Sequence, residues 1–238
     1  MRHVAALLLS LMAAPAAAEP ACTAPSGFTG IGVPLPRVAS ALAAGRKPVV
    51  VAIGSSSTEG VGASRLERSY PARLAVEMKA RHGIAFKVMN MGVGGEATSD
   101  MLRRFERDVM RYRPDLVIWQ VGSNTAVRHV DPGLHLQALE TGIGRLRGAG
   151  IDVVLMSPQY APRVIEAPHH REIVADLDRM AARSGTGLFH RFEIMRSWHE
   201  SGIGFDDMLS PDRLHMNDWS YGCVARLLAD AIAERLKP

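Results

Sequence analysis

Hydrophobic residues occur along this chain as short dense runs that alternate with longer segments of mixed polarity. The runs at residues 49–53, 116–121 and 151–156 are largely apolar, which is typical of strands covered on both faces. Two weaker runs, at 85–89 and 187–190, are also predicted to be strands. Helical spacing of apolar residues predicts helices over residues 38–44, 71–81, 97–112, 134–147, 171–183 and 218–236.

Strands that alternate with helices of this length predict an α/β fold. We expect a three-layer α/β/α sandwich, of the flavodoxin-like kind, around a central parallel sheet of about five strands. The 238 residues suit one domain with a single sizeable core, which we place at residues 45–238. In such sheets the working residues lie in loops beyond the carboxyl ends of the strands.

The N-terminus has the pattern of a secretory signal peptide. Arg2 and His3 are followed by an apolar stretch over 4–12 and by a small-residue cleavage site at 16–18. We therefore predict a signal peptide at 1–18, an irregular lead-in at 19–44, and a periplasmic or secreted protein. No later segment has the roughly 18 continuous apolar residues of a membrane helix, so no transmembrane anchor is expected.

Two cysteines are present, Cys22 and Cys223. In an oxidising compartment an even pair predicts a disulfide, which would bring the lead-in against the last helix. Two unpaired thiols are the alternative.

Charge and composition narrow the class of partner. The formal net charge is +4, no long run of like charges occurs, and aromatic residues make up 5% of the chain, which disfavours a nucleic-acid groove. The adjacent pair His169 and His170 lacks the spacing to cysteines or carboxylates that zinc sites use, so no metal site is predicted.

Polar residues that could carry chemistry follow the predicted strands. After 49–53 come Gly54 and three serines, where either a nucleophile or a simple polar turn would fit. After 85–89 comes a loop with Gly92, Gly94 and Gly95, which could expose backbone N–H groups to an anion or only make a tight turn.

Two further loops add an amide and a histidine with a carboxylate. Asn124 follows the strand at 116–121 and could donate a side-chain N–H into the site or cap a turn. Asp212 and His215 are three residues apart, just before the last helix. A histidine base needs a carboxylate on its other ring nitrogen, and this spacing can supply one, although each side chain alone is also typical of an ordinary loop.

Taken together, the four loops resemble the blocks of the SGNH hydrolases, also called the GDSL esterase/lipase family, over nearly all of the predicted mature chain. Ser56 matches the nucleophile of the first block and Asn124 the asparagine of the third, while Asp212 and His215 match the last. Gly95, before Glu96, is the best match to the second block, with Gly92 and Gly94 as close competitors.

Two positions depart from the family pattern. Ser55 stands where the first block usually has Asp, and Thr125 replaces the Asp that usually ends the third block. Neither position takes a direct part in the family's chemistry, so we interpret them as marks of a subgroup. A scaffold that has lost its activity is the alternative.

The resemblance implies a serine hydrolase without a cofactor. Ser56 would attack an ester carbonyl, His215 would accept and return the proton, and Asp212 would orient His215. The backbone N–H groups of Ser56 and Gly95 and the side-chain amide of Asn124 would form the oxyanion hole.

The substrate is less sharply indicated. Glu59, Gln159 and Tyr160 are candidate substrate contacts because of their place in the loops. Predicted export and the lack of a long apolar lid favour a short acyl group, such as acetyl on a carbohydrate or cell-envelope glycan. A lysophospholipase, a thioesterase, a glycan O-acyltransferase and an inactive glycan-binding protein are the alternatives. The oligomeric state is not predicted.

Overall fold

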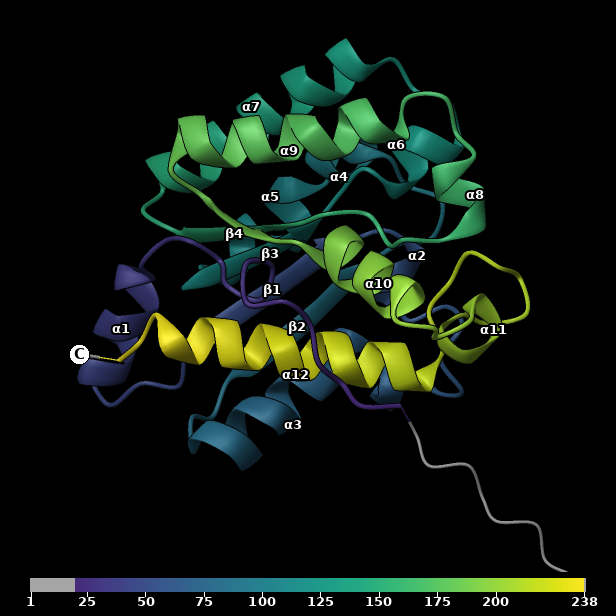
Figure 1. The fold of residues 1–238 in the computed structure, drawn as a ribbon. Coiled ribbons are helices and arrows are strands. Elements are labelled where there is room, and N and C mark those ends of the chain that lie inside the picture. The colour runs from purple at the N-terminus through teal and green to yellow at the C-terminus, as the bar shows by residue number, and fades with distance from the viewer. Residues whose placement is uncertain (1–19, 238) are drawn as a thin grey trace, which may run out of the picture.

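The computed structural model describes residues 20–237, which form a five-stranded sheet between two layers of helices (Figure 1). All neighbouring strands run parallel, in the order β2-β1-β3-β4-β5. The predicted α/β sandwich with about five parallel strands is therefore confirmed. The strands are β1 (Val49–Gly54), β2 (Lys87–Gly92), β3 (Leu116–Gln120), β4 (Asp152–Met156) and β5 (Gly187–Phe189).

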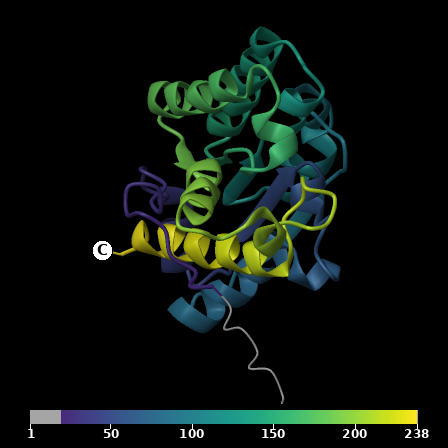
Figure 2. The same cartoon turned by 45° about the vertical axis from the view of Figure 1, so that its right-hand side comes forward.

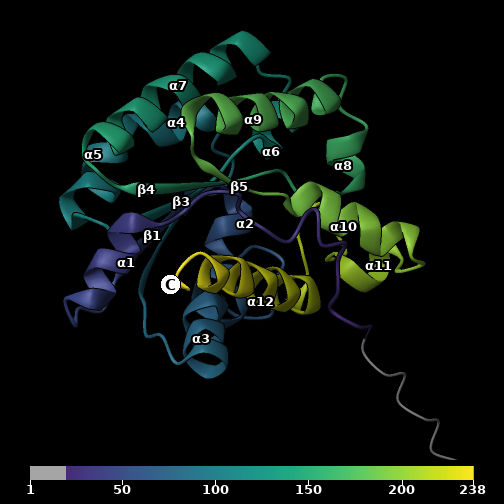
Figure 3. The ribbon, with the colours of Figure 1, turned by 60° about the vertical axis from the view of Figure 1, so that its left-hand side comes forward.

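Helices cover both faces of the sheet (Figure 3). On one side lie α4, α5, α7 and α9, and on the other α1, α3 and α12, with α10 and α11 beside the end of the sheet where the strands finish (Figure 1). The helices are α1 (Pro36–Ala43), α2 (Ser56–Glu59), α3 (Tyr70–His82), α4 (Thr98–Arg103), α5 (Phe105–Asp108), α6 (Ser123–Val127), α7 (Pro132–Gly148), α8 (Pro162–Ile165), α9 (His170–Ser184), α10 (Arg191–Glu200), α11 (Phe205–Met208) and α12 (Asp218–Glu234), with short 3₁₀ turns η1 (Leu66–Arg68) and η2 (Met110–Tyr112).

Alternate residues of the central strands enter two separate cores. In β1, Val50 and Ala52 join the core beneath α3 and α12, whereas Val51 and Ile53 join the core beneath α7 and α9. All four side chains are fully buried. Burial on both faces explains why the strand has no polar alternation and reads as one apolar run.

The strand order places a topological switch beside β1. The chain crosses from β1 to β2 on one side and then to β3 on the other, so the loops after β1 and β3 diverge and leave a crevice at their carboxyl ends. Ligands of open parallel sheets bind at this position. The fold therefore predicts a ligand site at the loops that follow Gly54 and Gln120.

The lead-in is tied to the rest of the fold at several points. It crosses α12 (Figure 2), and its carbonyl at Ile31 accepts the N–H of Leu188, which covers the edge of β5. A disulfide joins Cys22 to Cys223 of α12, with Cα atoms 5.4 Å apart. The indole N–H of Trp198 donates to the Thr23 carbonyl at 2.7 Å. The predicted signal peptide at 1–18 lies outside the described residues.

The structure corrects two local predictions and adds a long helix that was not predicted. The single helix expected over 97–112 is broken into α4, α5 and η2, because the chain turns at Arg104 and buries its guanidinium. The strand expected at 85–89 begins at Lys87 and continues to Gly92, since as an edge strand it is only partly covered and lacks a dense apolar run. The helix α10 was not predicted at all.

Among residues 20–237, no helix combines the length and the apolar character needed to cross a membrane.

Candidate active site

The loop after β1 presents Ser56 at the start of a short helix. A side chain at Gly54, the last residue of β1, would collide with Thr58 and Gln120, so only glycine fits at this position. The chain then turns at Ser55, and Ser56 becomes the first residue of α2. N–H groups in the first turn of a helix have no acceptor within that helix, so the N–H of Ser56 is directed outward.

Ser56, His215 and Asp212 form one hydrogen-bonded line. The Ser56 hydroxyl lies 2.7 Å from Nε2 of His215, and Nδ1 of His215 lies 2.5 Å from the Asp212 carboxylate. The side chain of His215 is 12% exposed and that of Asp212 42%. The hydroxyl is thus next to a base whose other nitrogen is fixed by a carboxylate, which is the arrangement that activates a serine.

The Asp212 carboxylate is held by several donors from its own loop. Oδ1 accepts from the Ser210 hydroxyl at 2.8 Å and from the backbone N–H groups of Leu214 and His215 at 3.0 and 2.9 Å. Burial raises the pKa of Asp212, but the hydrogen bonds from His215, Leu214 and Ser210 outweigh it and hold the pKa well below its usual range. The group is therefore a carboxylate that can accept from an imidazole N–H throughout the physiological range.

The glycine loop after β2 lies beside Ser56. A Cβ at Gly92 would overlap the backbone of Glu59, so the loop passes directly against α2. Gly95 has φ +78°, a conformation that favours glycine. In the described part of the chain, the N–H of Gly95 has no acceptor. This group is free to donate to a ligand.

Asn124 of α6 and Arg128, which directly follows this helix, bind two backbone carbonyls of the glycine loop. The side-chain amide of Asn124 donates to the Glu96 carbonyl at 3.0 Å, and Arg128 donates to the Gly95 carbonyl at 2.9 Å. An amide nitrogen carries two hydrogens, so Asn124 keeps one for a ligand. The geometry brings together Ser56, Gly95 and Asn124, the three residues predicted from the sequence to donate to an oxyanion.

Uncharged side chains form a hydrogen-bonded network at Ser55 and Thr125, the two positions that depart from the family pattern. Both the N–H and the hydroxyl of Ser55 donate to the side-chain oxygen of Gln120, each at 2.9 Å. The hydroxyl of Thr125 lies 3.3 Å from Nδ1 of His135, which also contacts the Thr98 hydroxyl at 2.8 Å. The two departures from the family pattern are therefore accommodated by buried hydrogen bonds.

Sequence reasoning missed Gln120, His135 and Arg191. Each is at most 1% exposed and lies directly behind the site. Burial lowers the pKa of His135 to about 4, so it is neutral at physiological pH. A glutamine near the end of an apolar strand is a weak signal for Gln120, whereas nothing in the local sequence distinguishes His135 or Arg191.

The three predicted substrate contacts have different surroundings. Glu59 is half-buried beside the glycine loop, and a Cβ at Gly94 would lie 3.0 Å from its carboxylate. Gln159 is 1% exposed, and its side-chain amide is used by Ser123, Arg191 and the Leu214 carbonyl. The interpretation of Gln159 as a substrate contact is therefore corrected, because its side chain faces the interior.

Tyr160 is half-buried in a group of aromatic rings outside the crevice. Its ring stacks on Phe205, with centroids 5.8 Å apart, and packs edge-on against Phe192 at 5.2 Å. The structure therefore leaves Tyr160 available to a substrate that extends beyond the reacting ester.

No group of three or more His, Cys, Asp or Glu side chains within residues 20–237 is arranged to hold a metal ion.

Comparison with protein-family models matches residues 21–238 to the non-GDSL lipase-like family. Among characterised proteins, an arylesterase of Vibrio mimicus is 23% identical over 171 residues, which cover 72% of this chain and 82% of that protein. This similarity extends over most of both chains.

Solved structures give the same fold. A two-domain esterase active on acetylated mannans, crystallised with mannopentaose, superposes with a TM-score of 0.71 and 19% identity, covering 87% of this chain and 55% of that one. The acetylxylan esterase Axe2 of Geobacillus stearothermophilus superposes with a TM-score of 0.67 and 18% identity, covering 78% of this chain and 94% of that one. The chain thus spans about half of the two-domain esterase and nearly all of the Axe2 chain.

Proposed function

The chain belongs to the non-GDSL lipase-like family and is a carboxylic ester hydrolase, and we propose that it is an exported serine esterase that removes acetyl-type groups from a glycan. Ser56 is the nucleophile in this proposal, His215 the general base and Asp212 its orienting carboxylate. The disulfide between Cys22 and Cys223 supports export, because such bonds persist in oxidising compartments.

One observation carries the proposal: the hydrogen-bonded line from the Ser56 hydroxyl through both ring nitrogens of His215 to Asp212. The hydroxyl attacks the ester carbonyl while Nε2 of His215 accepts its proton. The tetrahedral intermediate collapses when the same nitrogen returns the proton to the leaving alcohol. Water then attacks the acyl-enzyme with His215 as base again, and Ser56 is restored.

The negative oxygen of each tetrahedral intermediate needs donors that are already in place. The N–H groups of Ser56 and Gly95 and the free amide hydrogen of Asn124 supply them in this proposal. Because the loop carbonyls are fixed by Asn124 and Arg128, the donors need not reorganise when charge develops.

The choice of acyl group and carrier is supported by the relatives. Two esterases that share the fold act on acetylated mannan and on acetylated xylan. The half-buried rings of Tyr160 and Phe205 give this chain an aromatic surface that a sugar ring can contact.

Hydrolysis of longer acyl esters is a second candidate function, because large apolar side chains are exposed near Ser56. Val61, Leu66 and Val93 are large apolar residues with 39%, 67% and 40% of their surfaces exposed, and they stand on the two loops that flank Ser56. Such side chains could cover part of a fatty acyl chain.

The decisive experiment compares the mature protein with Ser56→Ala on p-nitrophenyl esters of two to twelve carbons and on acetylated xylan and mannan oligosaccharides. The proposal requires hydrolysis that disappears with Ser56→Ala, is fastest for acetyl esters and extends to the oligosaccharides. Fastest hydrolysis of the longest esters would favour the second candidate, and equal rates for both proteins would reject Ser56 as the nucleophile.

A further inference from the structure

A hollow of about 580 Å³ lies between α9 and α10, beside the loop that follows β4. We call it the α9–α10 hollow. Its walls combine aromatic rings, from Tyr160 and Phe192, with a carboxylate from Glu193, guanidinium groups from Arg171 and Arg196 and the imidazole of His170. The volume is in the range of roughly 300–1,000 Å³ that is typical of small-molecule sites. None of these residues belongs to the proposed catalytic group.

A row of side chains leads from the catalytic loop to this hollow. The guanidinium of Arg213, two residues before His215, lies 6.0 Å from the centre of the Phe205 ring. Phe205 stacks on Tyr160 with an interplanar angle of 23°, and Tyr160 meets Phe192 edge to face. These contacts link the loop that carries His215 to the wall of the hollow.

A hydrogen bond between the loop after β4 and the loop of His215 gives a second connection. The side-chain amide of Gln159 donates to the carbonyl of Leu214 at 3.2 Å. Tyr160 directly follows Gln159, and His215 directly follows Leu214. One hydrogen bond therefore fixes the wall of the hollow relative to the catalytic histidine.

Two polar atoms on residues that line the hollow lack hydrogen-bond partners. Oε2 of Glu193 and Nε of Arg196 are buried without a hydrogen-bond partner in the described part of the chain. The nearest opposite charges are Nδ1 of His190, 3.9 Å from Glu193, and the Glu200 carboxylate, 3.6 Å from Arg196. Burial raises the pKa of Glu193. Buried polar atoms left unpaired cost free energy, and a ligand that pairs them recovers it.

We propose that the α9–α10 hollow binds a neutral sugar unit of the glycan whose ester is cleaved at Ser56, an inference that rests on the proposed function. The C–H faces of a sugar ring suit the half-buried ring of Tyr160. Its hydroxyl groups both donate and accept, so neighbouring hydroxyls can serve the Glu193 carboxylate and the Arg196 guanidinium together. An ionised carboxylate ligand has no hydrogen to give to Glu193.

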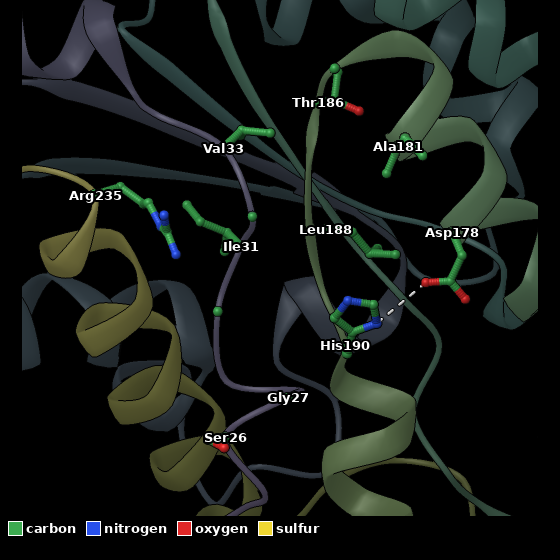
Figure 4. A pocket seen from close by; sticks show the side chains of 14 residues that line it. Ser26, Gly27, Ile31, Val33, Asp178, Ala181, Thr186, Leu188, His190 and Arg235 are labelled. Carbon is green, nitrogen blue, oxygen red and sulfur yellow. Dashed lines mark ion pairs between the residues drawn. The ribbon is translucent and has the colours of Figure 1, made fainter.

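A second hollow of the same volume offers a contrast. It lies between the lead-in and α9. Asp178 and His190 both line it, with Oδ1 of Asp178 3.5 Å from Nδ1 of His190 (Figure 4). Among its lining residues in the described chain there is no Phe, Tyr or Trp. Asp178 therefore tests whether a carboxylate on the neighbouring hollow matters to the glycan.

The experiment measures binding and turnover separately. Binding of mannopentaose and xylotetraose is titrated calorimetrically with Ser56→Ala as the parent protein, so that no ester is cleaved. Glu193→Gln and Tyr160→Ala are introduced into it, with Glu172→Gln, an exposed carboxylate on α9 outside the hollow, as the matched control. We expect Kd to rise roughly tenfold for the first two variants and to stay unchanged for the control.

The same changes in the active protein separate this inference from the proposed function. KM for the acetylated oligosaccharide rises roughly tenfold in Glu193→Gln and Tyr160→Ala, while KM for p-nitrophenyl acetate, which has no glycan, stays constant. Oligosaccharide binding that neither variant weakens, or that only Asp178→Asn weakens, overturns the sugar site and leaves the esterase intact. Absence of Ser56-dependent hydrolysis of p-nitrophenyl acetate overturns the proposed function instead.

Discussion

The guanidinium of Arg191 donates to the hydroxyl of Ser57, the residue that follows the proposed nucleophile, at 3.0 Å. The same group donates to the carbonyl of Ser157 and to the side-chain oxygen of Gln159, each at 3.0 Å. Arg191 is fully buried, and none of these partners is a carboxylate. Burial lowers the pKa of Arg191 to about 10, so it remains a cation at neutral pH. A single buried charge therefore joins the loops after β1 and β4 behind the nucleophile.

Replacing Arg191 with Met should destabilise the fold strongly. The change removes the charge but leaves the Ser157 carbonyl and the Ser57 hydroxyl without the donor they have in the described structure, while Gln159 keeps only the Ser123 hydroxyl. The free energy of unfolding should therefore fall by about 3 kcal/mol. Chemical denaturation measures this loss. Arg163→Met, an exposed arginine on α8, is the control and should change stability by no more than about 0.5 kcal/mol. Equal denaturation midpoints for the two variants would contradict the role of Arg191 as a link.

The sequence predicted the layers and the candidate site more fully than the interior behind the site. Dense apolar runs such as 49–53 identify buried strands because both faces of the sheet are covered. Ser56, Asn124 and His215 follow such strands or precede a long helix, so their loops could be located. The break at Arg104 was hidden because local helical periodicity continues through it, while the cause is tertiary: its guanidinium bonds to Glu96 and to the Gly54 carbonyl.

Partners of buried polar side chains are long-range, and this limits what the sequence can reveal. Gln159 stands in a loop beside candidate substrate residues, and only its contacts with Arg191 and Leu214 show that it faces inward. His135 lies on a helix whose periodicity gives no hint of its neighbours Thr98 and Thr125. Hydrogen bonds between segments ten or more residues apart are set by the assembled fold rather than by local pattern.

Replacing Asn124 with Ala should slow the chemical step. The amide contributes its free hydrogen only to the charged intermediate, so kcat should fall about 10²–10³-fold while KM for p-nitrophenyl acetate changes little. Steady-state kinetics separate the two parameters. Part of the effect would pass through the lost bond to the Glu96 carbonyl, and thermal unfolding of the variant measures that part. A raised KM with unchanged kcat would contradict an oxyanion role.

Replacing Asp212 with Asn should leave the loop folded but impair the base. Asn retains an oxygen that can accept from Leu214 and His215, yet its NH₂ group presents a donor to Nδ1 of His215 and favours the wrong tautomer. We expect kcat to fall by about 10³–10⁴. Asp206→Asn, a highly exposed carboxylate on α11, should retain nearly full activity. Comparable rates for both variants would exclude Asp212 as the orienting group.

Breaking the disulfide should destabilise the protein without touching the catalytic residues. Cys22 and Cys223 are 201 residues apart, and in the chain-entropy model a closed loop of this size contributes about 5 kcal/mol to the free energy of unfolding. Denaturation is compared with and without a thiol reductant. The reductant should lower the stability of the natural protein to that of Cys22→Ser and should leave Cys22→Ser unaffected. A natural protein that is insensitive to complete reduction would contradict the prediction.

His135 should make stability depend on pH between about 4 and 6.5. Its pKa is lowered from 6.5 to about 4 in the folded protein by burial. The unfolded chain therefore binds more protons in this window, and stability falls as pH decreases through it. The contribution is fully present above pH 6.5, and its total loss by pH 4 is about 3 kcal/mol, from 1.36 kcal/mol for each pKa unit.

The variant His135→Gln isolates the contribution of His135 to the pH dependence of stability, because glutamine can bond to the hydroxyl of Thr98 but does not titrate. Denaturation of both proteins at a series of pH values gives the difference in their free energies of unfolding. That difference should be constant above pH 6.5 and should shift in favour of the variant as the pH falls toward 4. Because Thr98 and Thr125 belong to the elements that carry the glycine loop and Asn124, acid inactivation of the natural protein should follow the same curve. Parallel pH profiles for the two proteins would mean that His135 has a normal pKa and that other groups govern the acid limit.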